Sequence, residues 1–291
     1  MHPLNRRGYT LVEVLIGLTL AGLVAGTTFR VLTESQRITR SLNGRVDAQQ
    51  NARTAALYLS TALREINSFE GDVVEATASE LEFRAMRWAG LTCSGLTTAG
   101  SDLQVVVRAT QLFGYRAPDA ALDSMFVYVE NDVETRADDQ WLDGRVMGVA
   151  TGTCDDGATG TQLTFQISAG SGGNGAAASF TEGSPLRGYQ REELTLFTDV
   201  TGISYLGSRT MNSAGTWTGI TELLGPLMAG GLSLSYFDTL GVATAALDEI
   251  ASIGVVVRTE SRESGRTSAG AIDKMRDSIV TRIALRNNRR F

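Results

Sequence analysis

Glu13 is the residue of this chain whose position most clearly calls for a chemical partner. It interrupts an apolar run of about 21 residues that ends near Phe29, which at 1.5 Å per residue is about 31 Å of helix, enough to cross a bilayer. A carboxylate in such a segment costs roughly 2.5–3.5 kcal/mol at the bilayer centre. No basic side chain lies one helical turn away within the run. A cut after Gly8 would create a cation, the α-amino group of Tyr9, which a neighbouring copy could bring to Glu13.

The residues around Glu13 also form a known processing signal. Segment 8–13, GYTLVE, follows two arginines and resembles the class III signal of type IV prepilins and pseudopilins. The resemblance implies that a prepilin peptidase cuts after Gly8, that Tyr9 is then N-methylated, and that Glu13 assists methylation and subunit docking. Two departures exist: the first mature residue of that family is most often Phe, and many pilins have a proline where this chain has Arg30.

Two other interpretations of the N-terminus remain. A secretory signal peptide has a basic start, an apolar core and a small-residue cut site, which Ala21-Gly22 or Ala25-Gly26 could imitate. The apolar run is long for such a core. A plain membrane anchor would explain the length, but both alternatives leave Glu13 without a role.

The charges predict an orientation and argue against one class of partner. Basic residues before the apolar run keep the N-terminus in the cytoplasm, so everything after about Val31 lies outside the inner membrane. The chain has 26 basic and 32 acidic residues, which give a net charge of −6. Removal of a leader that contains Arg6 and Arg7 would leave a net charge of −8. This acidic balance argues against nonspecific nucleic-acid binding through the whole surface, and the sequence predicts no specific nucleic-acid binding; it leaves open whether the domain contacts DNA, a surface or secreted cargo.

The two cysteines, Cys93 and Cys154, lie in Gly/Thr-rich segments of the part expected outside the cytoplasm, where disulfides form. A bridge would close a loop of about 60 residues and contribute roughly 4 kcal/mol in the chain-entropy model. The alternative is two unrelated thiols. The spacing fits neither a redox motif nor a zinc site.

Enzyme chemistry has few candidate groups here. The single histidine, His2, lies in the expected leader, and Lys274 is the one lysine. A mature chain without histidine has no usual acid–base dyad or Ser-His-Asp triad, so we predict no enzyme and no cofactor.

Acidic residues leave one open question. The pairs Asp138-Asp139 and Asp155-Asp156 are typical of solvated turns, although paired carboxylates also serve glycoside chemistry. Some pseudopilins bind calcium in acidic loops. The candidates for such a site, which lack EF-hand spacing, are Asp132, Asp138, Asp139 and Asp143.

The apolar helix is expected to continue beyond the membrane. Segment 33–67 has no proline, and Asn67 with Gly71 makes a stop signal. One helix from about Tyr9 to Asn67 would be about 88 Å long; the alternative is two helices broken near Gly44. The stripe expected to face a sheet consists of Ile38, Leu42, Gln49, Ala52, Ala56, Leu59, Leu63 and Ile66.

From Gly71 onward the pattern changes to strands separated by Gly, Ser, Thr and Asp, which predicts a mainly antiparallel sheet with one face on the helix. Segment 170–179, GSGGNGAAAS, is expected to be a flexible loop. The predicted strands are 80–86, 103–109, 125–129, 145–150, 162–167, 193–197, 232–237, 253–258 and 279–286.

The C-terminal part narrows the resemblance. Segments 222–241, 250–264 and 277–288 look like the last strands of the larger minor pilins of the PilW type and of J-type pseudopilins. The resemblance implies the pilin fold, an α+β fold in which a long hydrophobic stalk helix packs on a mainly antiparallel β-sheet domain.

We therefore expect four segments: leader 1–8, transmembrane and polymerisation half 9–32, amphipathic half 33–67, and β-rich periplasmic domain 68–291. The expected function is that of a minor pilin, a structural subunit of a type IV pilus at or near the tip. Its partners would be prepilin peptidase, other minor and major pilins, and the inner membrane. The alternatives are a J-type pseudopilin of a type II secretion system and an anchored adhesin or ligand-binding module that does not polymerise.

Overall fold

The computed structural model describes residues 10–129, 134, 140–168, 182–266 and 271–285. Its first element is one continuous helix of 54 residues, α1 (Leu11–Arg64). The helix is not broken at Gly44. A glycine fits there because the position faces the sheet, where a Cβ would lie 3.2 Å from Ser261. The helix ends at Arg64, three residues before the expected end at Asn67, and Glu65 is its C-terminal cap. A short 3-10 turn, η1 (Ser68–Glu70), then leads into the sheet.

The expected apolar stripe of α1 is correct only in its second half. Leu59 and Leu63 are fully buried against the sheet. Ile38 is 54% exposed because it lies before the stretch of helix that the sheet covers, and Leu42 is 58% exposed because at that level Ser41 and Gly44 face β12 (Ser252–Arg266) instead. Gln49 is also exposed, and the sheet-facing position there is taken by Ala48.

Every strand pairing that the structure describes is antiparallel, as expected. The nine predicted strands are present and mostly longer, although Arg286 and segment 170–179 lie outside the described residues. Four short strands, β1, β3, β5 and β10, were not predicted. The strands are β1 (Val73–Ala76), β2 (Glu80–Leu91), β3 (Thr97–Ala99), β4 (Asp102–Arg108), β5 (Phe113–Gly114), β6 (Ser124–Val129), β7 (Gln140–Thr153), β8 (Thr159–Ile167), β9 (Pro185–Thr198), β10 (Ser204–Thr210), β11 (Thr221–Phe237), β12 (Ser252–Arg266) and β13 (Ile272–Ala284).

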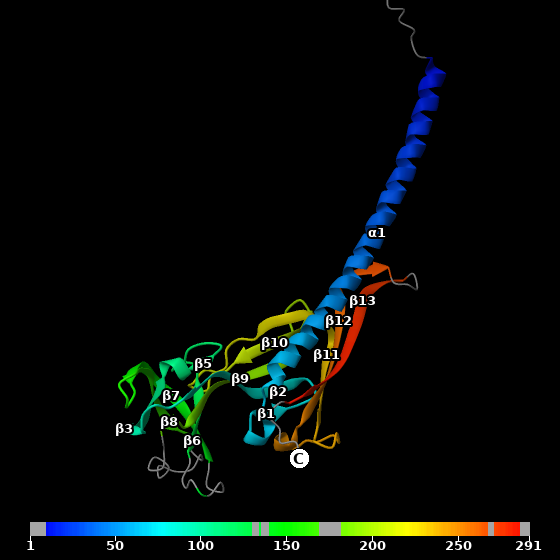
Figure 1. The fold of residues 1–291 in the computed structure, drawn as a ribbon. Coiled ribbons are helices and arrows are strands. Elements are labelled where there is room, and N and C mark those ends of the chain that lie inside the picture. The colour runs from blue at the N-terminus through cyan, green and yellow to red at the C-terminus, as the bar shows by residue number, and fades with distance from the viewer. Residues whose placement is uncertain (1–9, 130–133, 135–139, 169–181, 267–270, 286–291) are drawn as a thin grey trace, which may run out of the picture.

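The sheet divides at β9. One edge of β9 pairs along its length with β2, while its other edge pairs first with β6 and then with β10. From β10 the sheet continues through β11 and β12 to β13, and from β6 it continues through β7, β8 and β4 to β3. We call the part built on α1 and β10–β13 the proximal lobe, and the part formed by residues 88–188 the distal lobe. Figure 1 shows the distal lobe, in green, to one side of the stalk and away from it.

Each lobe has its own core. In the proximal lobe Leu59 and Leu63 of α1 pack with Leu194, Val255 and other buried residues of the sheet. The distal core contains no residue of α1 and gathers around Trp88, Phe165 and Leu163. Burying a large apolar side chain contributes roughly 1.5–3 kcal/mol, so each cluster can hold its lobe together. The long strands β2 and β9 contribute to both cores and join the two lobes.

Candidate functional site: the exposed helix and the junction of the lobes

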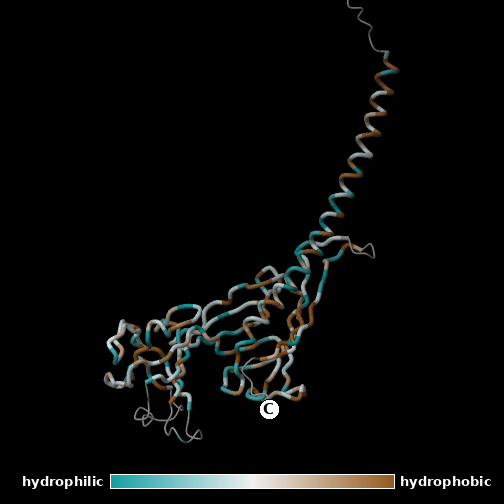
Figure 2. The backbone as a smooth tube through the Cα atoms, viewed as in Figure 1, coloured by the Kyte–Doolittle hydropathy of each residue, from teal (hydrophilic) through white to brown (hydrophobic). Residues whose placement is uncertain are grey.

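The first half of α1 is apolar and uncovered. The helix contains an 18-residue window with a mean hydropathy of 1.8, none of it buried, so by length and composition it is able to cross a membrane. Figure 2 shows these apolar residues along the stalk, projecting from the sheet. The large side chains that are more than half exposed include Leu11, Val12, Leu15, Ile16, Leu18, Leu20, Leu23, Val24, Phe29, Val31 and Leu32.

Glu13 lies in the first turn of α1, where it forms a reciprocal cap with Thr10. The Thr10 backbone N–H and hydroxyl donate to Glu13 Oε2 at 3.0 and 3.1 Å, and the Glu13 N–H donates to Thr10 Oγ1 at 3.2 Å. The carboxylate therefore has neutral donors in its own chain, the backbone N–H and hydroxyl of Thr10, and no basic partner is needed for it to be hydrogen-bonded. The sequence predicts this cap, because Thr followed three positions later by Glu is the capping-box pattern. The positive end of the helix dipole favours a carboxylate at the same place.

Gly8 and Tyr9, the expected cleavage and methylation residues, lie outside the described part of the chain. Thr10 is its first described residue and has extended backbone angles, φ −75° and ψ 151°. The helix therefore begins directly after the expected new N-terminus. A cut after Gly8 would leave a two-residue extension before a capped helix.

The expected disulfide is present. Cys93 and Cys154 are bonded, with their Cα atoms 5.0 Å apart and both side chains buried. The bridge ties the segment after β2 to the turn between β7 and β8. The Asp155 N–H donates to Cys93 O at 3.0 Å, which closes the same junction through the backbone. The disulfide therefore belongs wholly to the distal lobe.

The acidic candidates do not form a metal site in the part of the chain that is described, where no group of three or more His, Cys, Asp or Glu residues is suitably placed. Asp132, Asp138 and Asp139 lie outside that part, and Asp143 accepts a hydrogen bond from Tyr189 Oη at 2.7 Å.

The pair Asp155-Asp156 lies in the turn between β7 and β8, as expected for turn residues. The Ala158 backbone N–H and the Arg108 guanidinium hold the pKa of the Asp156 carboxyl below its ordinary value.

Ion pairs lie at the junction of the lobes, and one of them, between Arg187 and Glu70, crosses it. Arg87 on β2 is 2.8 Å from Glu192 on β9, and Arg187 on β9 is 2.8 Å from Glu70 in η1. Arg191 on β9 also pairs with Glu82 on β2. No sequence pattern indicated these pairs, because each joins residues more than a hundred positions apart. The Arg187–Glu70 pair attaches the distal lobe to the turn that follows the stalk, and the other two pairs fasten β2 to β9 beside it.

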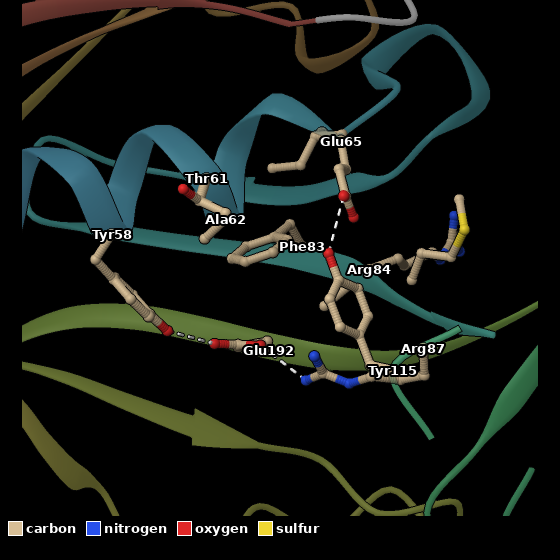
Figure 3. A pocket seen from close by; sticks show the side chains of 12 residues that line it. Tyr58, Thr61, Ala62, Glu65, Phe83, Arg84, Arg87, Tyr115 and Glu192 are labelled. Carbon is tan, nitrogen blue, oxygen red and sulfur yellow. Dashed lines mark hydrogen bonds and ion pairs between the residues drawn. The ribbon is translucent and has the colours of Figure 1, made fainter. Parts of the chain in front are cut away.

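A small cavity of about 210 Å³ lies at this junction, between the last turns of α1 and strand β2. Figure 3 shows Tyr58 pointing to Glu192, which also holds Arg87, while Tyr115 reaches across to Glu65. Burial, and then the negative charge of Glu192, raise the pKa of Tyr58 to about 12. Tyr58 is therefore a protonated hydrogen-bond donor at neutral pH. Its hydroxyl, the Arg87 guanidinium and the Ser208 hydroxyl all donate to Glu192, so this wall of the cavity is a satisfied polar network.

Comparison with known proteins identifies the N-terminal segment. The family model described as the prokaryotic N-terminal methylation motif matches residues 3–29. Searches of curated proteins and of solved structures found no match. The matched segment contains Gly8, Tyr9 and Glu13 and ends within the uncovered part of α1. This motif, together with the long apolar helix packed on an antiparallel sheet, is consistent with a type IV pilin-like protein.

Proposed function

We propose that this chain is a minor pilin, a structural subunit that enters a type IV pilus at or near its tip. The observation that carries the proposal is the uncovered apolar half of α1. Exposure of so large an apolar surface to water is strongly unfavourable, so this half requires lipid or the helices of other subunits. A pilin has both in turn: the inner membrane before assembly and the fibre core afterwards.

The proposed path begins at the membrane. The N-terminus lies in the cytoplasm and the two lobes in the periplasm. Prepilin peptidase removes the leader after Gly8 and methylates Tyr9. Glu13 then exchanges its bonds with Thr10 for the amine of a neighbouring subunit. Opposite charges attract strongly in low dielectric, so this exchange favours the assembled state over the free one.

The tip position rests on the distal lobe. The proximal lobe alone has the stalk helix, the sheet and the core of a pilin. The distal lobe adds about a hundred residues to one side of the stalk (Figure 1). In a helical fibre every internal subunit has neighbours above and below, and a lateral body of this size obstructs them. A terminal subunit has neighbours on one side only.

The experiment is to find the chain in fibres. Pili sheared from cells are labelled with gold-conjugated antibody against the distal lobe and examined by electron microscopy. The proposal predicts label at one end of a fibre. Label along the whole length would contradict a tip position, and absence of the chain from fibres would favour the non-polymerising adhesin.

A J-type pseudopilin would share the helix, the signal and the C-terminal strands. Deletion of the gene separates the two roles. Loss of surface pili with intact protein secretion agrees with a minor pilin, whereas loss of secretion with intact pili would identify a pseudopilin.

A further inference from the structure

A second cavity at the junction of the lobes has an unusual charge. It has a volume of about 370 Å³ and opens on the face shared by β2, β6, β7 and β9. Arg84, Arg191 and Arg145 line it from three different strands, and Asp143 is the one acid in its described lining. The sequence around it is acidic: residues 92–184 contain twelve acidic and four basic residues, a net charge of −8. Positive charge is thus concentrated at this cavity.

Arg84 and Arg191 lie directly opposite one another on the neighbouring strands β2 and β9. Like charges in this position destabilise a sheet, since their Cβ atoms are about 5 Å apart. Glu82 pairs with Arg191. Arg84 is 3.8 Å from Asp143, which also accepts a hydrogen bond from Tyr189. The three arginines that line the cavity, taken together with Asp143 and Glu82, carry one excess positive charge.

The cavity also has donors that are not used. Arg84 Nη1 donates to Gly71 O at 2.7 Å, whereas its buried Nε has no hydrogen-bond partner among the described residues. Leaving a buried donor unsatisfied costs about 1–3 kcal/mol. Arg145 is exposed and forms no ion pair with any described residue. Asn212 accepts backbone hydrogen bonds at its side-chain oxygen from residues 214 and 216, which leaves its NH2 group to donate elsewhere.

The guanidinium of Arg84 is held in place by aromatic rings. Its central carbon is 5.0 Å from the ring centre of Phe126 and 5.3 Å from that of Tyr189. Burial, and then the charge of Asp143, raise the pKa of the Tyr189 hydroxyl, so Tyr189 stays protonated and keeps donating to Asp143. Asp143 is therefore occupied within the wall, and the arginines set the character of the cavity.

We propose that this cavity binds a small saccharide that carries a carboxylate. A planar carboxylate matches the fork of a guanidinium. The hydroxyls of a sugar ring match the other polar groups of the lining, Ser124, Ser168 and Asn212. A volume of about 370 Å³ lies at the lower end of the range for small-molecule sites, which suits one ring. The inference rests on the proposed function for the location of the cavity outside the cell, where acidic polysaccharides occur.

The test uses the full chain in detergent micelles and isothermal titration calorimetry with D-glucuronate, D-glucose and acetate. Glucuronate should bind, and added salt should weaken its binding. Glucose lacks the charge and acetate lacks the ring, so each should bind at least about tenfold more weakly, a loss of about 1.4 kcal/mol.

Arg145→Gln is the decisive variant, because this exposed side chain has no structural ion pair to lose. This substitution should weaken the binding of glucuronate at least about tenfold. Arg258→Gln, which replaces an exposed arginine on β12 that forms no ion pair with any described residue, is the matched control and should leave the affinity unchanged. Absence of glucuronate binding, equal binding of acetate, or an unchanged affinity of Arg145→Gln would each overturn the proposal. None of these results depends on fibre assembly, so they leave the proposed function to its own test.

Discussion

Glu13 Oε2 accepts hydrogen bonds from both the backbone N–H and the hydroxyl of Thr10, so one carboxylate caps the stalk helix within its own chain. The same atom is the proposed acceptor for the amine of a neighbouring subunit. Capping and docking are therefore two roles of one side chain, which different substitutions can separate.

Glu13→Gln should keep the cap and lose the docking. Glutamine serves at the third position of a capping box as glutamate does, so the first turn should stay helical. Without the charge a neighbour's amine has no partner, so the variant should be cleaved and inserted but absent from sheared fibres. Glu13→Asp, which keeps the charge on a shorter arm, should be partly competent. Quantitative immunoblots of membrane and sheared fractions measure both. Incorporation of Glu13→Gln at the wild-type level would remove the docking role.

Gly8→Val should block processing. The peptidase of the resembled family cuts after glycine, and a branched side chain at this position leaves the full-length precursor in the membrane. An immunoblot that resolves precursor from mature chain measures the result, with Arg7→Lys as the control that keeps the leader charge. Normal processing of Gly8→Val would show that the cut lies elsewhere.

Replacing both cysteines, Cys93→Ser with Cys154→Ser, should loosen the distal lobe alone. The bridge spans a sequence separation of 61 residues, for which the chain-entropy model gives about 4 kcal/mol of stability. Limited proteolysis followed by mass spectrometry should find new cuts between residues 92 and 184 and none in β11–β13. Cuts spread over both lobes would contradict two separately held cores. Alkylation of native, non-reduced protein should label neither cysteine of the wild type.

Tyr58→Phe should remove a pH-dependent part of the stability. The pKa of Tyr58 is raised in the folded chain to about 12 from an ordinary value of 10.0, so the folded state holds this proton more tightly. Its contribution is complete below pH 10 and is lost as the pH rises from about 10 to about 12. At pH 8 the variant should be about 0.5–1.5 kcal/mol less stable than wild type, the net value of a hydrogen bond.

Urea denaturation of the Tyr58→Phe variant and wild type at pH 8 and pH 11.5 should show this difference shrinking at the higher pH. Tyr115→Phe is the control, because the Tyr115 hydroxyl also bonds a carboxylate but its side chain is 71% exposed. A difference between Tyr58→Phe and wild type that stays constant with pH would contradict the role given to burial and Glu192.

Gly188→Ala should destabilise the distal core. A Cβ at this position would lie 1.9 Å from the ring of Trp88, which is fully buried and cannot move aside. Overpacking of this kind costs about 1–3 kcal/mol. Gly148→Ala is the matched control on β7, where the new Cβ would be 3.6 Å from Thr164. Equal stability of the two variants, measured by thermal unfolding, would show that Trp88 can shift.

The helix and the longer strands could be predicted because their signals are local. An unbroken apolar and then amphipathic segment is sufficient for α1, and alternation is sufficient for β12 or β6. Ile38 and Leu42 were placed on the buried stripe although they are exposed, because periodicity gives neither how far the sheet extends along the helix, which decides Ile38, nor the exact face that meets β12, which decides Leu42. Strand β10, SYLGSRT, was missed because glycine and arginine interrupt its apolar residues.

The candidate site was predicted only at the N-terminus. There the motif is contiguous, so Gly8, Tyr9 and Glu13 can be named from sequence. The junction of the lobes depends on long-range pairing, such as Arg84 opposite Arg191, which no local pattern encodes. The disulfide could be predicted because two cysteines in an oxidising compartment leave one possible intramolecular bond.

The most direct measurement of the central claim is the intact mass of the chain purified from the membranes of its host. The account predicts a chain that begins at Tyr9, shorter by the eight leader residues and heavier by one methyl group on the new amine. A full-length mass would contradict it, as would a chain cut near Ala21 or Ala25, which would identify a secretory signal peptide.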